Sequence, residues 1–129
     1  MEQSEYLIDT NTIIDYLGQK LPSAGIEFLN PIIDNIPNVS VISKIEVLGF
    51  NTTDQHYQIL NNFMNDATVL DLTGPVVDVC IELRRKYKTK LPDAIIAATA
   101  LVYDLVLITR NISDFKNIQR LKVINPHSL

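Results

Sequence analysis

Four carboxylates lie at or near junctions between expected strands and expected helices, far apart in the chain: Asp9, Glu46, Asp93 and Asp114. In an α/β fold such junctions gather at one rim of the sheet, at the carboxyl ends of the strands, where ligands bind. Carboxylates that face one another repel unless a cation lies between them, and Mg²⁺ and Mn²⁺ prefer oxygen ligands. These positions therefore predict a metal-dependent enzyme.

Each carboxylate also has an ordinary structural explanation. Asp9 and Asp114 could cap helices, Asp93 lies in a first helical turn, where the helix dipole favours negative charge, and Glu46 could face solvent. The neighbouring residues favour a site. Asp9 follows an apolar strand and Asp93 precedes an apolar helix, so both are expected to be partly buried and to need a partner.

Other chemistries find little support in the sequence. The two histidines, His56 and His127, lack the spacing of zinc ligands, and the single cysteine, Cys80, sits in an apolar segment typical of a reduced core thiol. We find no phosphate-binding loop, dinucleotide motif or nucleophile elbow. Asp15 falls with other acids on an expected polar helix face, so we expect it to be solvated.

Charge is divided unevenly along the chain. Residues 1–83 carry two basic and twelve acidic side chains, whereas residues 84–129 carry nine basic and three acidic, within a net charge of −4. The densest basic run, residues 84–90, holds five positive charges. Such a run could contact a phosphate backbone, or could be a solvated helix end whose cations offset the dipole. From charge alone, the candidates for contact with such a backbone are Arg84, Arg85, Lys86 and Arg110.

Alternating strands and helices must position these groups. Apolar runs predict strands over residues 5–9, 39–42, 68–72, 105–108 and 122–125. Helical spacing predicts helices over residues 10–19, 43–48, 54–65, 73–87, 93–103 and 113–121, with a partly helical 22–36 that Pro31 should kink or split. We expect Ser43 and Asp54 to cap their helices. This alternation is typical of an α/β class three-layer sandwich around a mostly parallel sheet of four to five strands.

The length of 129 residues fits a single domain, residues 1–129. We find no secretory signal, and the longest apolar run, residues 94–103, is about half of the roughly 20 residues that a membrane-spanning helix needs. With one cysteine and no expected membrane contact, the sequence predicts a cytoplasmic protein.

The order of four motifs resembles the PIN-domain nucleases, and within them the VapC-type toxins of type II toxin–antitoxin pairs. The motifs are LIDTN at residues 7–11, SKIE at 43–46, LPDAIIAATA at 91–100 and LITRNISDF at 107–115, and the resemblance covers essentially the whole chain. It implies a PIN-like fold and a Mg²⁺- or Mn²⁺-dependent endoribonuclease. Asp9, Glu46, Asp93 and Asp114 would then hold the metal, and the polar positions lining the site would be Thr10, Asn11, Thr109 and Asn111.

The resemblance also implies partners. Besides the RNA substrate, it implies a homodimer and a small antitoxin whose tail covers the active site. Two other readings stay open: a catalytically inactive PIN-like module that binds RNA or protein, and a signalling receiver phosphorylated on Asp71. The receiver fold should also carry paired acids after the first strand, where Asp9 stands alone.

Overall fold

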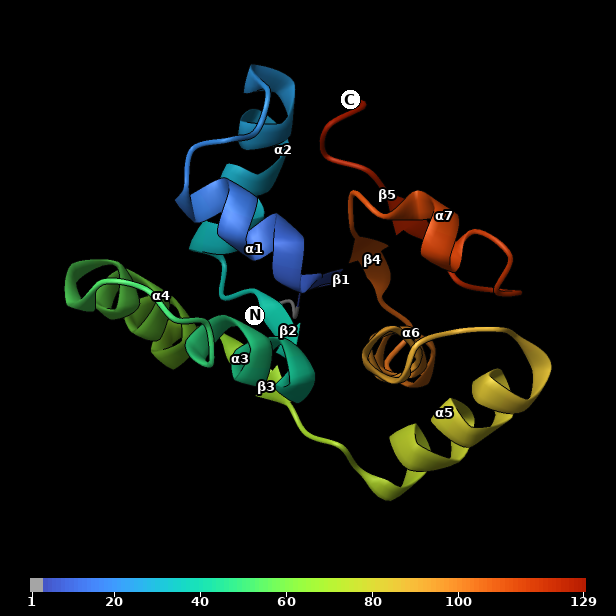
Figure 1. Cartoon of the computed structure of the whole chain (residues 1–129). Helices are drawn as coiled ribbons and strands as arrows, with labels where there is room; N and C mark the ends of the chain where they lie inside the picture. Colours follow the sequence, from blue (N-terminus) through green and yellow to red (C-terminus); the bar gives the residue numbers. More distant parts are fainter. Residues whose placement is uncertain (1–3) are drawn as a thin grey trace.

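The structure is a computed structural model that describes residues 4–129. Strands and helices alternate along much of the chain (Figure 1). The strands are β1 (Tyr6–Ile8), β2 (Asn38–Ser40), β3 (Thr68–Leu70), β4 (Val106–Ile108) and β5 (Val123–Ile124). The helices are α1 (Thr10–Leu17), α2 (Ser23–Asp34), α3 (Val41–Leu48), α4 (Asp54–Asp66), α5 (Gly74–Lys86), α6 (Leu91–Val102) and α7 (Ile112–Phe115).

The five strands form one sheet in the order β3-β2-β1-β4-β5, and every neighbouring pair is parallel. The central pair aligns Leu7 with Leu107 and Ile8 with Ile108. All the strands therefore end at the same rim, and β1 and β4 end side by side at its centre. The predicted parallel α/β sheet is confirmed, with five strands.

Helices cover both faces of this sheet. Successive strand residues point to opposite sides, so each face carries apolar side chains that the helices cover. Leu7 and Leu107 belong to one buried apolar cluster, which they share with residues of α5, α6 and α7. Ile8 and Ile108 belong to a second cluster with residues of α1, α2, α3 and α4. Figure 1 shows the two groups of helices on opposite sides of the strands, which confirms the three-layer sandwich.

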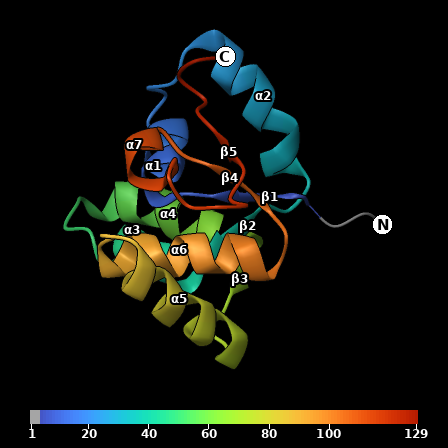
Figure 2. The ribbon, with the colours of Figure 1, turned by 90° about the vertical axis from the view of Figure 1, so that its right-hand side faces the viewer.

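Helix α6 is the most deeply buried helix among the described residues, and its composition explains why. Every side chain from Ala94 to Ala100 is buried, including Thr99, whose hydroxyl donates to the carbonyl of Ile95 at 2.7 Å. Alanine lets the helix approach its neighbours closely, and Figure 2 shows α5 running along it. This packing fixes the first turn of α6, which carries Asp93.

Several predicted boundaries are wrong by a few residues. Helix α3 begins after Ser40, whose hydroxyl accepts from the Ile42 amide, so Ser43 lies inside the helix. Thr53 rather than Asp54 caps α4, since its side chain accepts from the His56 amide. Pro31 does not split α2, which runs unbroken over Ser23–Asp34. The last helix is shorter than predicted, and Arg120 beyond it adopts a left-handed φ of 69°.

Candidate active site

The rim at the carboxyl ends of β1 and β4 carries the predicted site residues. Asp9 directly follows β1, and its amide donates to the Ile108 carbonyl at 3.0 Å, which continues the sheet by one residue. Thr109 follows β4 in the same way, with its amide bonded to the Ile124 carbonyl at 2.9 Å. Parallel pairing thus places the Asp9 and Thr109 side chains together at the centre of the rim.

Asp9 is only 4% exposed, and both of its carboxylate oxygens have donors. Oδ1 accepts from the Thr10 amide at 2.8 Å, which makes Asp9 the N-cap of α1. Oδ2 accepts from the Thr109 hydroxyl at 2.7 Å, and that hydroxyl oxygen in turn accepts from the Asn111 amide at 3.0 Å. Asp9 therefore caps α1 and at the same time lies at the predicted site.

Glu46 reaches the same rim from α3 through a chain of hydroxyl groups. The Thr10 hydroxyl lies 2.7 Å from Glu46 Oε1 and 2.9 Å from the buried Ser43 hydroxyl. A hydroxyl has one proton to donate. When Thr10 donates to Glu46, Ser43 therefore donates to Thr10. The exposed carboxylate of Glu46 is thereby tied to the residue next to Asp9.

The carboxylates repel one another across the rim. Burial raises the pKa of Asp9 above its usual value, and the charges of Glu46 and Asp114 raise it further against the opposing effect of its hydrogen bonds. Burial, followed by the charges of Asp114, Asp9 and Glu46, raises the pKa of Asp93 to about 6, although Lys90 lowers it in part. The four carboxylates that the sequence singled out therefore act on each other in the folded chain.

The donor set fits a hard divalent cation. Among residues 4–129 no arginine forms a salt bridge with any of the four carboxylates, and a cation among them would relieve the repulsion that raises the pKa of Asp93. In residues 4–129, however, no group of three or more acidic, histidine or cysteine side chains is already arranged to hold a metal ion. Glu46 and Asp114 are both exposed, but Glu46 is held by the Thr10 hydroxyl, so Asp114 is the side chain that can turn more readily toward an ion.

The remaining predicted polar positions are Asn11 and Asn111. Asn11 lies half-buried in the first turn of α1, beside Thr10. Asn111 precedes α7, and its side chain makes no capping hydrogen bond there. Its amide group is therefore not committed to the helix end.

The basic candidates do not share one role. Arg84 and Arg85 are exposed at the end of α5, where they also offset the helix dipole. Lys86 donates to Gln119 Oε1 at 3.2 Å, and its ammonium lies 5.5 Å from the centre of the Tyr87 ring. Lys86 therefore ties the end of α5 to the segment after α7.

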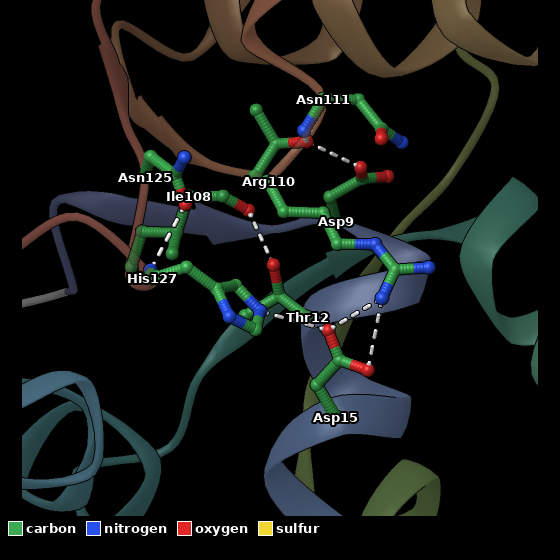
Figure 3. A network of polar contacts seen from close by, with 9 residues as sticks. Asp9, Thr12, Asp15, Ile108, Arg110, Asn111, Asn125 and His127 are labelled. Atoms are coloured by element: carbon green, nitrogen blue, oxygen red, sulfur yellow. Dashed lines mark hydrogen bonds and ion pairs between the residues drawn. The ribbon is translucent and has the colours of Figure 1, made fainter. Parts of the chain in front are cut away.

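Arg110 is bound to an acid that we expected to be solvated. Asp15 is 4% exposed, and its carboxylate oxygens lie 3.0 and 3.2 Å from Arg110 Nη1. His127 Nε2 approaches the same carboxylate at 3.1 Å (Figure 3). The expectation of a solvated Asp15 is wrong, because the Arg110 and His127 side chains, which come from distant segments, cover it.

A cleft of about 250 Å³ opens beside the carboxylates. Asp93 and Asp114 form part of its wall, and the loop between α5 and α6 forms another part with Lys88 and Lys90. Lys88 and Lys90 belong to the basic run of residues 84–90 but were not among the four candidates for RNA contact, and they share a cleft with two of the four predicted site acids.

Comparison with known proteins places the chain among characterised folds. The model of the PIN domain family matches residues 6–121. A search of curated proteins found no match.

No helix of the described residues is long and apolar enough to cross a membrane.

Solved structures with the same fold come from toxin–antitoxin systems. A toxin–antitoxin complex from Klebsiella pneumoniae contains a chain 29% identical, with a TM-score of 0.78 over 96% of this chain and 99% of that one. DNA-bound VapBC from Salmonella typhimurium gives a TM-score of 0.81 at 22% identity, covering 96% and 99% of the two chains. VapBC2 from Rickettsia felis gives 0.79 at 22% identity, covering 93% and 97%.

Proposed function

The chain belongs to the PIN domain family, and on that premise we propose that it is a Mg²⁺- or Mn²⁺-dependent endoribonuclease. The observation that carries the proposal is the rim on which the charges of Glu46 and Asp114 raise the pKa values of Asp9 and Asp93. Nucleases that use metal ions need carboxylates grouped closely enough to hold cations, and structural acids on a protein surface do not need to gather in this way.

In this proposal Asp9, Glu46, Asp93 and Asp114 hold the metal. A bound Mg²⁺ or Mn²⁺ supplies an activated water for in-line attack on phosphorus and stabilises the negative charge that develops on the phosphate. The carboxylates carry the charge that attracts the ion. Exposed Asp114 could adjust to the ion, whereas buried Asp9 would stay in place.

The surrounding hydroxyl and amide groups hold the acids in position. The Thr10 amide and the Thr109 hydroxyl fix both oxygens of Asp9, so its carboxylate keeps one orientation. The Thr10 hydroxyl holds Glu46 toward the same point. Asn11 and Asn111 offer amide groups at the edge of the site, where they can hydrogen-bond to the RNA backbone. Preorganised ligands bind an ion without the entropic cost of ordering them first.

We further propose that the chain is the toxin of a VapBC-like pair, acting in the cytoplasm. Support comes from the chain 29% identical in a toxin–antitoxin complex, which matches almost end to end. The partner would be a small antitoxin that covers the carboxylate rim, and the chain would form a homodimer. Light scattering of the purified protein should report about twice the mass of 14.6 kDa, and a monomer at micromolar concentration would count against the dimer.

The test of catalysis is cleavage of RNA by the purified chain with Mn²⁺ or Mg²⁺. We expect cleavage in the wild type, loss on addition of chelator, and loss in Asp9→Asn and Asp93→Asn. Asp104→Asn is the matched control, because it makes the same change of charge just after the opposite end of α6. Cleavage that survives both site substitutions would overturn the assignment of the site.

The alternative is a PIN-like module that binds RNA or protein without cutting. It predicts RNA binding that persists while the wild type leaves RNA intact at all Mn²⁺ concentrations. A complete set of four acids supports the enzyme, since a binding module has no need to retain them.

The hypothesis of a signalling receiver loses its support for two reasons. Asp71 follows β3 at the edge of the sheet rather than at its centre. The chain also matches the PIN domain family rather than a receiver family.

A further inference from the structure

The cleft beside the carboxylates is lined by acidic and basic residues. Asp93 and Asp114 line it together with the loop of residues 87–90 between α5 and α6. Ser113, Asn117 and Ile118 complete the lining. At about 250 Å³ the cleft is smaller than the roughly 300–1,000 Å³ of pockets for whole small-molecule ligands. It therefore suits one unit of a longer chain that continues beyond it.

The charges of the cleft point to an anion next to a cation site. Lys88 and Lys90 are both exposed on the loop wall, within three to five residues of Asp93 along the chain. Lys90 is close enough for its charge to lower the pKa of Asp93. These lysines would attract an anion into the cleft, next to the proposed cation site.

The loop wall is held in place by its neighbours. The Tyr87 hydroxyl accepts from the Gln119 amide at 3.1 Å, and Lys86 donates to the Gln119 side chain at 3.2 Å. The Tyr87 amide donates to the Leu83 carbonyl, and the Thr89 amide donates to the Tyr87 carbonyl. The loop that carries Lys88 is therefore anchored at α5 and at the segment after α7, which limits the ordering that a ligand must impose.

One polar group in this wall has no partner. Thr89 Oγ1 is buried and makes no hydrogen bond to any atom of residues 4–129. Buried hydroxyl groups are normally satisfied by protein, water or ligand. The exposed Ser113 and Asn117 side chains also line the cleft and can donate hydrogen bonds. Together with Lys88 and Lys90 they give the cleft neutral and cationic donors, the combination that binds phosphate oxygens.

We propose that this cleft binds a backbone phosphate of single-stranded RNA one nucleotide or more away from the phosphate that is cut, with Lys88 and Lys90 as its cationic contacts. This inference rests on the proposed function and adds to it a binding subsite. It moves the main RNA contact from the exposed face of α5 to the loop after it. Lys86 supports the loop rather than contacting RNA.

The test measures binding of a fluorescent single-stranded RNA of about a dozen nucleotides in Mg²⁺, using Asp9→Asn so that the RNA stays intact. Asp9 is not part of the cleft wall. Adding Lys88→Ala should weaken binding roughly fivefold to tenfold. It should also reduce the slope of log Kd against log salt by about 0.7, the value for one phosphate contact on a single strand. Lys88→Arg should restore the slope.

Lys122→Ala is the matched control, since Lys122 is exposed before β5 at the opposite rim of the sheet. Lys88 is preferred to Lys90 because loss of Lys90 would also change the ionisation of Asp93. Equal salt slopes for Lys88→Ala and Lys122→Ala would overturn the proposal. Unchanged thermal unfolding of both variants shows that the difference is not a loss of folding.

A second arm uses the active protein. Lys88→Ala should raise KM for the long RNA severalfold with kcat nearly unchanged, and should leave cleavage of a dinucleotide with one phosphate unaffected. Equal loss on the two substrates would place Lys88 at the cut phosphate and overturn the proposal. If the wild type cuts no RNA but Lys88→Ala still reduces the salt slope, the subsite holds and the proposed function fails. If RNA is cut and the slope is unchanged, the subsite fails alone.

Discussion

The Thr109 hydroxyl donates a 2.7 Å hydrogen bond to Asp9 Oδ2, although the two residues are one hundred positions apart in the chain. Both side chains are buried, Thr109 at 0% exposure and Asp9 at 4%. The contact exists because β1 and β4 pair in parallel and end together. It is the point at which the fold fixes the orientation of a site carboxylate.

Replacing Thr109 with valine keeps the shape of the side chain and removes this donor. We expect Thr109→Val to destabilise the protein by about 1–3 kcal/mol, because the buried Asp9 oxygen and the Asn111 amide both lose a partner. Thr109→Ser should retain most of the stability. Urea unfolding of the two variants measures the difference, and equal midpoints would show that the hydrogen bond contributes nothing.

Removing Asp15 should leave the Arg110 guanidinium and the His127 ring without their partner. Because the Arg110 side chain is 45% exposed and can turn to solvent, we expect Asp15→Ala to cost roughly 1–3 kcal/mol, below the range for fully buried pairs. A double-mutant cycle with Arg110→Ala, followed by chemical unfolding, measures the coupling between the two side chains. Additive losses would contradict a stabilising pair.

Asp93 should make the metal-free protein less stable as the pH rises. Its pKa is 3.8 unfolded and about 6 folded, so the folded state binds the proton more tightly. The contribution of Asp93 is fully present below pH 3.8 and is lost as the pH passes 6.

The variant Asp93→Asn removes this pH-dependent contribution to the free energy of unfolding. After allowance for solvent screening of a half-exposed group, it should be more stable than the wild type in EDTA at pH 7.5 by roughly 1 kcal/mol, a few degrees in Tm. Thermal melts from pH 4 to 8 test this, with Asp104→Asn as control. If the Tm of the wild type instead rose above that of Asp93→Asn as the pH increased, the prediction would be refuted.

Divalent cations should stabilise the wild type at neutral pH. A ligand that binds only the folded state adds about 2.7 kcal/mol when its concentration is one hundred times its Kd. We expect Mn²⁺ to raise the Tm of the wild type, and to raise that of Asp9→Asn far less, because Asp9 is the buried member of the proposed ligand set. Equal Tm shifts in the two proteins would place the bound ion elsewhere.

Two glycines offer a matched test of how the C-terminal segment packs. A Cβ on Gly25 in α2 would lie 2.3 Å from the Pro126 carbonyl oxygen, whereas a Cβ on Gly74 meets nothing within 4 Å. We expect Gly25→Ala to destabilise by about 1–3 kcal/mol through displaced backbone. Gly74→Ala should be neutral or stabilising by up to about 1 kcal/mol. Calorimetry would refute the close approach if the two variants melted alike.

Much of the fold could be predicted because hydrophobic periodicity depends on neighbouring residues. The apolar runs around Leu7 and Leu107 predict buried parallel strands, and the alanines of α6 predict a tightly packed helix. Boundaries were less certain where two local signals compete. Ser40 and Ser43 are both good caps, and Val41 and Ile42 suit a strand or a helix equally. The pairing of β2 with β3, which ends at Ser40, decided between them.

Three of the four carboxylates could be predicted as a group because Asp9 directly follows a strand and Asp93 and Asp114 lie in first helical turns. Glu46 lies in the second half of α3, and its motif rather than its place in the helix pointed to it. The effect of the neighbouring charges on the pKa values of Asp9 and Asp93 required the folded chain. The partners of Asp15 could not be predicted, since Arg110 and His127 lie 95 and 112 residues away. The same holds for the cleft, because its walls come from two segments that only tertiary packing brings together.

The sequence by itself determined the order of strands and helices, the chemical types of the site residues and the family they resemble. These properties depend on residues close together in the chain, where periodicity and motif spacing act. Only the tertiary structure decided which carboxylate is buried, which hydroxyl orients it and which lysines face the same cleft. Burial and charge–charge interaction depend on distance in space. Parallel pairing of the strands brings side chains close together even when they are far apart along the chain.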